Sequence, residues 1–433
     1  MHKEAFLEVG VGIGIIGFGT VGSGVVKLLL KNGTILKERV GKELVLKKVA
    51  DIDLERDRGI KLPSELLTRN AEHVIEDPEV DIVVELIGGI QPARDYILKA
   101  LERHKPVVTA NKALLAQYGK ELFKFAAERG LSIGFEASVG GGIPIVKAIK
   151  EALVGNDIKA IFGILNGTSN YILTRMSEEG MSFNEALREA QRMGIAEADP
   201  SLDVDGWDAA HKITILASLA FGRWVDFRKV YVEGIRDLTP SDIQFAKEFG
   251  YAIKLLAIAK KDPDGIQIRV HPTMVPERHL LAQTRGYFNA IYVVGDAVGP
   301  LLFYGQGAGS LPTASAVLSD LADLAKGNCY LPSFKDEDGS VKEMGELKTV
   351  YYLRFSAVDR PGVLSKISGI LGENDISIAS VIQKGRTRKG AVPIVMITHE
   401  AVERNIKRAL REIDKLDVIK KPTKLIRAEV FDL

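Results

Sequence analysis

The run Gly17-Phe18-Gly19-Thr20-Val21-Gly22 decides the fold of the N-terminal part of the chain. It follows an apolar stretch at residues 11–16, which predicts a buried strand, and opens an amphipathic stretch at 21–30, which predicts a helix. In this context the first glycine permits a tight turn, the second lets the backbone approach a pyrophosphate, and the third lets helix and strand pack closely. The helix N-terminus also attracts phosphate charge. The run therefore predicts a dinucleotide-binding site of the Rossmann type.

Apolar runs alternate with helical periodicity through the same part of the chain. Further strands are predicted at residues 44–50, 82–86, 106–109 and 131–135, and helices at 93–103 and 114–129. This alternation predicts βαβ units and a parallel sheet. We place the nucleotide-binding domain at residues 1–136. We expect residues 300–326 to complete it, because Pro312 is a favourable start for a helix after the glycine-rich stretch 305–309.

Length and charge restrict the class of protein. The chain has 433 residues, which at about 150 per domain suggests three domains. Its 58 basic and 57 acidic side chains leave a formal charge of +1, so we expect no nucleic-acid partner. The uncharged stretch 9–26 is too rich in glycine for a membrane helix, and residues 1–8 lack a signal-peptide pattern. Cys329 is the only cysteine, which excludes an intramolecular disulfide and fits the cytoplasm.

Charged residues follow two of the predicted strands, at the edge where open α/β sheets bind ligands. Asp51 and Asp53 end the second strand, where a carboxylate accepts hydrogen bonds from the ribose hydroxyl of NAD. Arg56 and Arg58 are close enough to meet the 2′-phosphate of NADP instead, so the pattern favours NAD and leaves NADP open. Lys112 follows the strand predicted at 106–109. Its side chain could face the cofactor or the substrate, or it could be an ordinary surface lysine.

The middle of the chain, residues 137–299, predicts an α+β catalytic and dimerisation domain. Ser182 and Glu185 form a capping box that opens a helix, and an acidic loop then leads into a second helix at 206–221. Reading that loop as an EF-hand puts Lys212 where the bidentate glutamate belongs, which excludes a calcium loop. We expect Asp205 to cap the second helix. Asp208 lies four residues before Lys212, so both face one side of it.

Two interpretations of this acidic stretch remain open. Asp208 and Lys212 form either an exposed salt bridge or, with Glu197 and Asp199 nearby, a reaction site. Carboxylates around one lysine suit a substrate that carries an ammonium group and a hydroxyl or carbonyl group.

An ordered set of motifs resembles homoserine dehydrogenase. It covers residues 10 to about 325 without a break and comprises the stretches 17–22, 109–116, 136–144, 166–173, 197–200, 208–212 and 307–317. The resemblance implies the reversible, nicotinamide-dependent interconversion of aspartate 4-semialdehyde and homoserine.

The same resemblance implies roles for individual residues. Lys212 would donate and accept the proton at the reacting oxygen, with Asp208 and Lys112 in the catalytic group. Substrate ligands would be Glu197, Asp208, Gly167 and Thr168. The nucleotide would contact Gly17, Phe18, Gly19, Thr20, Val21, Gly22, Asp51, Lys112 and Gly307. A monovalent cation, usually sodium, would bind at Glu136, Val139, Gly141 and Ile143, unless these form a plain glycine-rich turn.

Two other functions were weighed. An aldehyde-oxidising dehydrogenase that forms a thiohemiacetal needs a nucleophilic cysteine, and Cys329 is far in sequence from every motif. An NAD-binding, amino-acid-sensing regulator without turnover explains the glycine run but leaves the stretch from Glu197 to Lys212 unexplained.

The C-terminal part predicts a separate module. Residues 327–347 have the composition of a linker, and residues 348–433 predict the order βαββαβ, with Asp359-Arg360-Pro361-Gly362 after the first strand. This order resembles an ACT domain, which implies a homodimer or homotetramer. It also implies a threonine-like effector between the loop at 359–362 and the turn near Asn374; the alternative is a dimerisation module without ligand. We expect truncation after Glu346 to leave activity but abolish the response to the effector.

Overall fold

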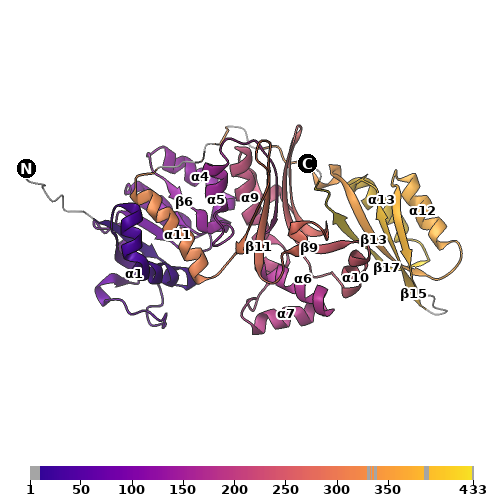
Figure 1. Cartoon of the computed structure of the whole chain (residues 1–433), viewed down its shortest axis with the longest axis horizontal. Coiled ribbons are helices and arrows are strands. Elements are labelled where there is room, and N and C mark those ends of the chain that lie inside the picture. The colour runs from indigo at the N-terminus through magenta and orange to yellow at the C-terminus, as the bar shows by residue number, and fades with distance from the viewer. Residues whose placement is uncertain (1–9, 329–331, 333, 336–338, 385–389, 432–433) are drawn as a thin grey trace, which may run out of the picture.

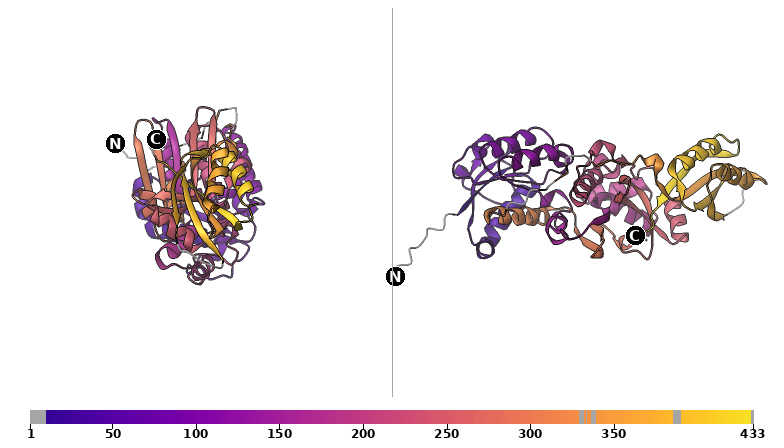
Figure 2. Two further views of the ribbon diagram at one scale, coloured as in Figure 1. Left: turned by 90° about the vertical axis from the view of Figure 1, so that its right-hand side faces the viewer. Right: turned by 90° about the horizontal axis from the view of Figure 1, so that it is seen from above.

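Three parts of the chain follow one another along the long axis of the molecule (Figures 1 and 2). The structure is a computed structural model that describes residues 10–328, 332, 334–335, 339–384 and 390–431. The nucleotide-binding part lies at one end, the C-terminal part at the other, and a large sheet with its helices lies between them (Figure 1). Among the described residues, no helix is both long and apolar enough to cross a membrane.

The N-terminal part is the expected Rossmann-type parallel sheet. Its strands lie in the order β3-β2-β1-β4-β5-β6, with the central β1, β4 and β5 almost wholly buried, which confirms the predicted fold class. The strands are β1 (Val11–Ile16), β2 (Leu44–Ala50), β3 (Leu67–Thr68), β4 (Ile82–Glu85), β5 (Val107–Thr109) and β6 (Ile133–Gly134). The helices that follow them are α1 (Thr20–Val40), α2 (Glu72–Ile75), α3 (Ala93–Glu102) and α4 (Lys112–Ala127).

The first helix is longer than the sequence pattern predicts. The helix predicted at 21–30 continues to Val40, which is buried, and ends at Gly41 in the left-handed conformation. Gly33 faces open space within this helix. A single glycine costs only about 1 kcal/mol in a helix interior, so the packing of neighbouring apolar residues outweighs it.

The stretch 300–326 divides between two parts of the molecule. Its helix, α11 (Ser310–Ala325), packs against α1 in the nucleotide-binding part, where a Cβ added at Gly24 would lie 2.6 Å from the Ser310 carbonyl oxygen. The residues before that helix form strand β12 (Gly299–Gln306), which pairs with the middle sheet. The chain therefore crosses back between the two parts at residues 307–309 (Figure 1).

The middle and C-terminal parts share one continuous sheet. Its order is β12-β11-β7-β9-β10-β17-β13-β15-β14, and the middle part contributes the first five strands. These are β7 (Ile158–Ile164), β9 (Tyr251–Asp262), β10 (Gly265–Pro276), β11 (Phe288–Gly295) and β12, with the short β8 (Tyr231–Val232) beside β10. The helices of the middle part are α5 (Ile145–Lys147), α6 (Gly167–Glu179), α7 (Phe183–Arg192), α8 (Ser201–Val204), α9 (Trp207–Phe221) and α10 (Pro240–Glu248).

The C-terminal part has the predicted βαββαβ order. It consists of β13 (Lys348–Val358), α12 (Val363–Glu373), β14 (Ile378–Gln383), β15 (Ala391–Thr398), the two-residue β16 (Ala401–Val402), α13 (Glu403–Ile413) and β17 (Ile419–Ala428). Its own apolar core lies between this sheet and the two helices. It is not detached from the rest, because the end of β17 pairs in parallel with β10 at Arg427 and Ala428. The stretch before it packs on both other parts, since Phe334 contacts Phe123 on α4 of the nucleotide-binding part and Trp224 of the middle part.

Candidate active site

A buried carboxylate joins two lysines where the nucleotide-binding and middle parts meet. Asp208 is the second residue of α9 and is 4% exposed. Its Oδ2 lies 2.7 Å from the Nζ of Lys212, one turn later on the same helix, as the spacing predicts. Its Oδ1 lies 2.6 Å from the Nζ of Lys112, the first residue of α4. One carboxylate therefore bridges an ammonium group from each part.

Two residues at the end of β7 complete the polar contacts of this group. Lys212 donates a hydrogen bond of 2.7 Å to the carbonyl oxygen of Leu165. The side-chain nitrogen of Asn166 donates to Asp208 Oδ2 at 2.9 Å and to Asp203 Oδ1 at 2.6 Å. Sequence reasoning assigned no role to Asn166. Its place between a strand and a helix was the available signal, because its side-chain oxygen caps α6.

Burial and charge shift the protonation equilibria of this group. Burial lowers the pKa of Lys212, and the Lys112 charge adds to that effect, while Asp208 opposes it. The Asp208 carboxylate raises the pKa of Lys112, which stays charged. Burial alone would raise the pKa of Asp208, but the two ammonium groups outweigh it and hold that pKa below its usual value. Lys212 is thus the lysine that gives up its proton more readily.

A neutral histidine lies next to these charges. Burial lowers the pKa of His211 to about 4, and its ring stacks on Phe227 with centroids 4.5 Å apart. At neutral pH His211 therefore adds no positive charge to the group.

The glycine run forms the expected turn between β1 and α1. Gly17 has a φ of 104°, and a Cβ added at Gly22 would lie 2.0 Å from the Gly17 carbonyl oxygen. Gly19, by contrast, faces open space, where a pyrophosphate needs room. Beside this turn lies a cavity of about 480 Å³, lined by Gly17, Gly19, Asp51, Ile52, Arg69, Gly88 and Tyr96 among others.

The carboxylate after β2 contacts the glycine turn directly. Asp51 Oδ2 accepts a hydrogen bond of 2.6 Å from the Phe18 N–H, and its Oδ1 accepts one of 2.9 Å from the Asp53 N–H. The Arg58 guanidinium lies 3.4 Å from Asp51 and over the Phe18 ring. The Asp53 side chain closes its own turn by accepting from Arg56 N–H. These contacts tie the strand end to the turn and hold the Arg58 guanidinium against Asp51.

The four residues of the expected cation turn lie together between β6 and α5. Glu136 is 2% exposed, and its two oxygens accept N–H groups of Val146 and Lys147 at 3.0 and 2.6 Å. Burial raises the pKa of Glu136 to about 7, and the Asp320 charge adds to this. Val139 and Ile143 are buried, and a Cβ added at Gly141 would lie 2.6 Å from the carbonyl carbon of Gly307. Within the described residues, no group of three or more His, Cys, Asp or Glu side chains could hold a metal ion.

The remaining predicted substrate ligands border the lysine–carboxylate group. Gly167 begins α6 directly after Asn166, and Thr168 donates a hydrogen bond of 3.0 Å to the Ile195 carbonyl oxygen. That bond holds the loop that carries Glu197. Glu197 itself is exposed, and its charge raises the pKa of Lys112.

Comparison with known proteins identifies the family. The family model for homoserine dehydrogenase matches residues 144–322, the one for its NAD-binding domain matches 17–136, and an ACT-domain model matches 351–418. A homoserine dehydrogenase of Neisseria gonorrhoeae is 44% identical over 97% of this chain and 98% of its own length. The crystal structure of a homoserine dehydrogenase from Thiobacillus denitrificans is 45% identical, covers 97% of this chain and 98% of its own, and superposes with a TM-score of 0.91.

The chain belongs to the homoserine dehydrogenase family. A more distant relative, a hyperthermophilic archaeal homoserine dehydrogenase mutant solved with NADPH, is 29% identical over 74% of this chain and 99% of its own, with a TM-score of 0.63. The family confirms an NAD(P)-dependent oxidoreductase with an ACT domain, as the motifs predict. The comparisons support neither the NAD-sensing regulator nor the thiohemiacetal-forming enzyme. Cys329, on which the latter depends, lies outside the described residues.

One local expectation about the acidic loop is wrong. Asp205 does not cap α9, because Gly206 is the N-cap residue, with a φ of 90°. The Asp205 carboxylate instead accepts a hydrogen bond of 3.0 Å from Arg236. A glycine in the left-handed region lets the chain turn sharply from α8 into α9, which points the Asp205 side chain outward.

Proposed function

We propose that the chain interconverts L-aspartate 4-semialdehyde and L-homoserine with NAD(P), and that Lys212 transfers the proton at the reacting oxygen. The observation that carries this proposal is the Asp208 carboxylate held between Lys112 and Lys212 at 2.6 and 2.7 Å. It sets one buried, readily deprotonated lysine beside one that stays charged. That pair lies at the junction between the nucleotide-binding part and the middle part.

The bound nicotinamide would supply or accept the hydride at the substrate carbon. In the reducing direction, negative charge develops on the aldehyde oxygen, and the Lys212 ammonium stabilises it and donates the proton. In the oxidising direction, neutral Lys212 removes the hydroxyl proton. Burial lowers the pKa of Lys212, which favours this second role. Lys112 remains charged and keeps Asp208 ionised in both directions.

Substrate recognition needs groups for an α-ammonium and an α-carboxylate. We assign the ammonium to Glu197 and Asp208, because the first is exposed at the rim and the second is buried within the group. The N-terminus of α6 at Gly167 and Thr168 offers backbone N–H groups toward the same loop.

The decisive assay follows nicotinamide absorbance with homoserine and NAD⁺ or NADP⁺. Wild-type turnover with homoserine supports the proposal, and turnover of other alcohols but not homoserine refutes it. Lys212→Arg is the matched variant, because arginine keeps the charge but stays protonated and cannot act as a base.

We propose that the turn at Glu136, Val139, Gly141 and Ile143 binds a monovalent cation. Support comes from Glu136, whose buried carboxylate accepts one N–H at each oxygen and so keeps a lone pair on each. A cation there would offset the buried charge. Thermal unfolding in sodium chloride against tetramethylammonium chloride tests this proposal at equal ionic strength. The midpoint should rise with sodium in the wild type and not in Glu136→Gln.

We further propose a homodimer, or a tetramer built from it, in the cytoplasm. Strand β12 is an open edge of the shared sheet, and Tyr304 on it is 54% exposed. Tyr304 stacks on Phe288, which stacks on Tyr287, so an aromatic surface extends beside that edge. Open edges of this kind pair readily with another chain. Sedimentation of the wild type against Tyr304→Lys tests it: a monomeric variant is expected, and an unchanged mass contradicts this surface.

For the ACT domain we propose a threonine-like amino acid as effector. Gly362 is the N-cap of α12, with a φ of 88°, so the loop before it lies close to the first amides of that helix. The Arg360 guanidinium lies 2.7 Å from Asp417 across this loop. Asn374, at the end of the same helix, is 3% exposed.

A further inference from the structure

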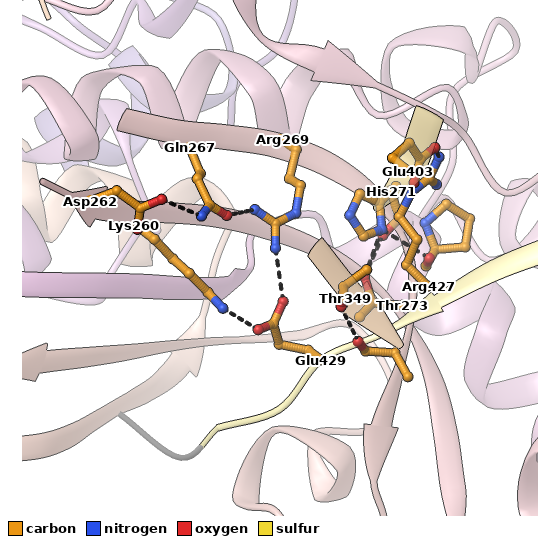
Figure 3. Close-up of polar contacts among 12 residues, drawn as sticks. Lys260, Asp262, Gln267, Arg269, His271, Thr273, Thr349, Glu403, Arg427 and Glu429 are labelled. Atoms are coloured by element: carbon orange, nitrogen blue, oxygen red, sulfur yellow. Dashed lines mark hydrogen bonds and ion pairs between the residues drawn. The ribbon is translucent and has the colours of Figure 1, made fainter. Parts of the chain in front are cut away.

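A buried ionic network lies where the C-terminal part meets the middle part (Figure 3). Arg427, near the end of β17, is 2% exposed. Its guanidinium donates to Glu403 of α13 at 2.6 and 3.0 Å, within the C-terminal part. It also donates to Glu233, just after β8, at 2.7 Å and to the Tyr231 hydroxyl at 3.1 Å. One arginine thus holds acidic groups from both parts.

The segment that Arg427 holds is in turn bound to the turn before α9. Ile235 N–H donates a hydrogen bond of 2.9 Å to the Val204 carbonyl oxygen at the end of α8. Gly234 packs directly on the same peptide, since a Cβ there would lie 2.5 Å from that oxygen. A shift of Glu233 would therefore also displace the end of α8, because the two backbone segments are hydrogen-bonded and closely packed.

Helix α8 carries a side chain that reaches the lysine–carboxylate group. Asp203 Oδ1 accepts a hydrogen bond of 2.6 Å from Asn166 Nδ2. The same nitrogen donates to Asp208 Oδ2 at 2.9 Å. Because an amide nitrogen has only two hydrogens and these two carboxylates take both, a shift of Asp203 changes the geometry of the hydrogen bond from Asn166 to Asp208.

We propose that Arg427 is a positioning residue for the substrate site, acting through Glu233, α8 and Asn166 on Asp208. The proposal rests on the proposed role of Asp208 as a substrate ligand. Its physical basis is the cost of a buried charge that loses its main partner: removal of the guanidinium leaves the fully buried Glu403 with only the half-exposed Lys407 as a cation. Glu233 loses its ion pair at the same time, so the two carboxylates repel each other. The segment 231–235 then moves away from its present position. The ACT domain, through its last strand, becomes part of the scaffold of the active site.

The same route gives the effector domain a physical path to the reaction site. Glu403 is the first residue of α13, so a ligand that displaces α13 or β17 changes how Arg427 divides its bonds between Glu403 and Glu233. Truncation after Glu346 would remove Arg427 as well as the effector site. It should therefore raise the KM for homoserine, in addition to the loss of effector response that the sequence alone predicts.

The domain boundary offers a matched control. Arg354 on β13 binds Asp242 of α10 at 2.7 Å, and the Tyr352 hydroxyl donates to the same carboxylate at 3.2 Å. This pair also joins the two parts through a buried arginine–carboxylate contact. It is bonded to α10, whereas the Arg427 contacts lead to α8. If general loss of domain docking were the cause, replacement of either arginine should raise the KM for homoserine. If the contacts from Arg427 to α8 are the cause, only replacement of Arg427 should raise it.

The experiment compares Arg427→Met, Arg427→Lys, Glu233→Gln and Arg354→Met with the wild type in full-length chains. Each is measured for thermal unfolding, for NADH affinity by fluorescence, and for kcat and KM with homoserine. We expect both methionine variants to unfold at lower temperature and to bind NADH normally. Arg427→Met should raise the homoserine KM about tenfold, against less than about twofold for Arg354→Met. Arg427→Lys should be intermediate, because an ammonium holds one carboxylate but not two.

The KM of a double variant tests whether Glu233 and Arg427 act through the same contact. Glu233→Gln combined with Arg427→Met should raise KM no further than Arg427→Met alone, because both act on one contact. Glu233→Gln also carries the test if Arg427→Met fails to fold, since the Glu233 side chain is 30% exposed and its change is mild. Equal KM values for Arg427→Met and Arg354→Met, or additive effects in the double variant, would overturn the proposal. A wild type that does not oxidise homoserine would instead refute the proposed function.

Discussion

Replacement of Lys212 by methionine tests the proposed chemistry most directly. Lys212 is 7% exposed and bonds to Leu165 and Asp208, so an unbranched apolar side chain fills nearly the same space. The variant leaves Asp208 paired with Lys112 at 2.6 Å, so no buried charge loses its last cation. Loss of its two buried hydrogen bonds, to Leu165 and Asp208, costs about 1–3 kcal/mol of folding stability each, against a total of about 5–15 kcal/mol for a domain. NADH binding should therefore stay close to that of the wild type.

The rate should fall far more than the stability. Loss of proton transfer alone lowers a rate by about 10²- to 10⁴-fold, and this is the range we expect for kcat of homoserine oxidation. Because burial lowers the pKa of Lys212, the wild-type oxidation rate should rise with pH below the usual lysine range. The reduction rate should fall over the same interval, since the proton donor is lost. The variant should lack both limbs of this pH dependence.

The assay is steady-state absorbance of the nicotinamide at a series of pH values, in both directions, with NADH affinity measured in parallel. Turnover of the methionine variant within about tenfold of the wild type would show that another group moves the proton. The same conclusion would follow if the pH dependence were unchanged.

Three further predictions concern the substrate, the cofactor and the effector. Asp208→Asn and Glu197→Gln should each raise the KM for homoserine, and an unchanged KM together with an unchanged kcat in either variant would remove that residue from the substrate site. NAD should be used at least as well as NADP, because Arg58 is already held by the Asp51 carboxylate and the Phe18 carbonyl oxygen; a strong NADP preference that Arg58→Ala abolishes would reverse this assignment. Threonine should inhibit the wild type but not Gly362→Ala, because position 362 has a φ of 88°, which disfavours a side chain. The matched variant Gly369→Ala should remain inhibited, because position 369 lies in the same helix and has open space around it. Equal inhibition of the two variants would contradict the effector site.

Local features of the site could be predicted because they depend on a few neighbouring residues. The glycine turn follows from the steric freedom of glycine at positive φ, which Gly17 adopts. Asp208 and Lys212 share a helix face because residues four apart lie one turn from each other, and their ion pair of 2.7 Å follows from that spacing. The capping box at Ser182 is equally local, since its two hydrogen bonds join residues three apart.

The resemblance to a family added what local patterns lack, namely the grouping of Lys112 with Asp208 and Lys212, which lie far from it in the chain. From periodicity alone, Lys112 could equally have been a surface lysine. The structure places its ammonium group against Asp208. It also brings in Asn166, which no charge pattern pointed to because amides are common before helices.

By itself, the sequence determined the alternation of the main strands and helices in the N-terminal part, the βαββαβ order of the C-terminal part, the glycine turn, and the helix face that carries Asp208 and Lys212. The tertiary structure decided which distant groups become partners: Lys112 with Asp208, β17 with β10, and Arg427 with Glu233. The physical reason is that backbone conformation is governed by nearby residues, whereas a buried charge takes its partner from whatever element packs beside it. Such a pairing depends on how the three parts of the chain bury their surfaces together.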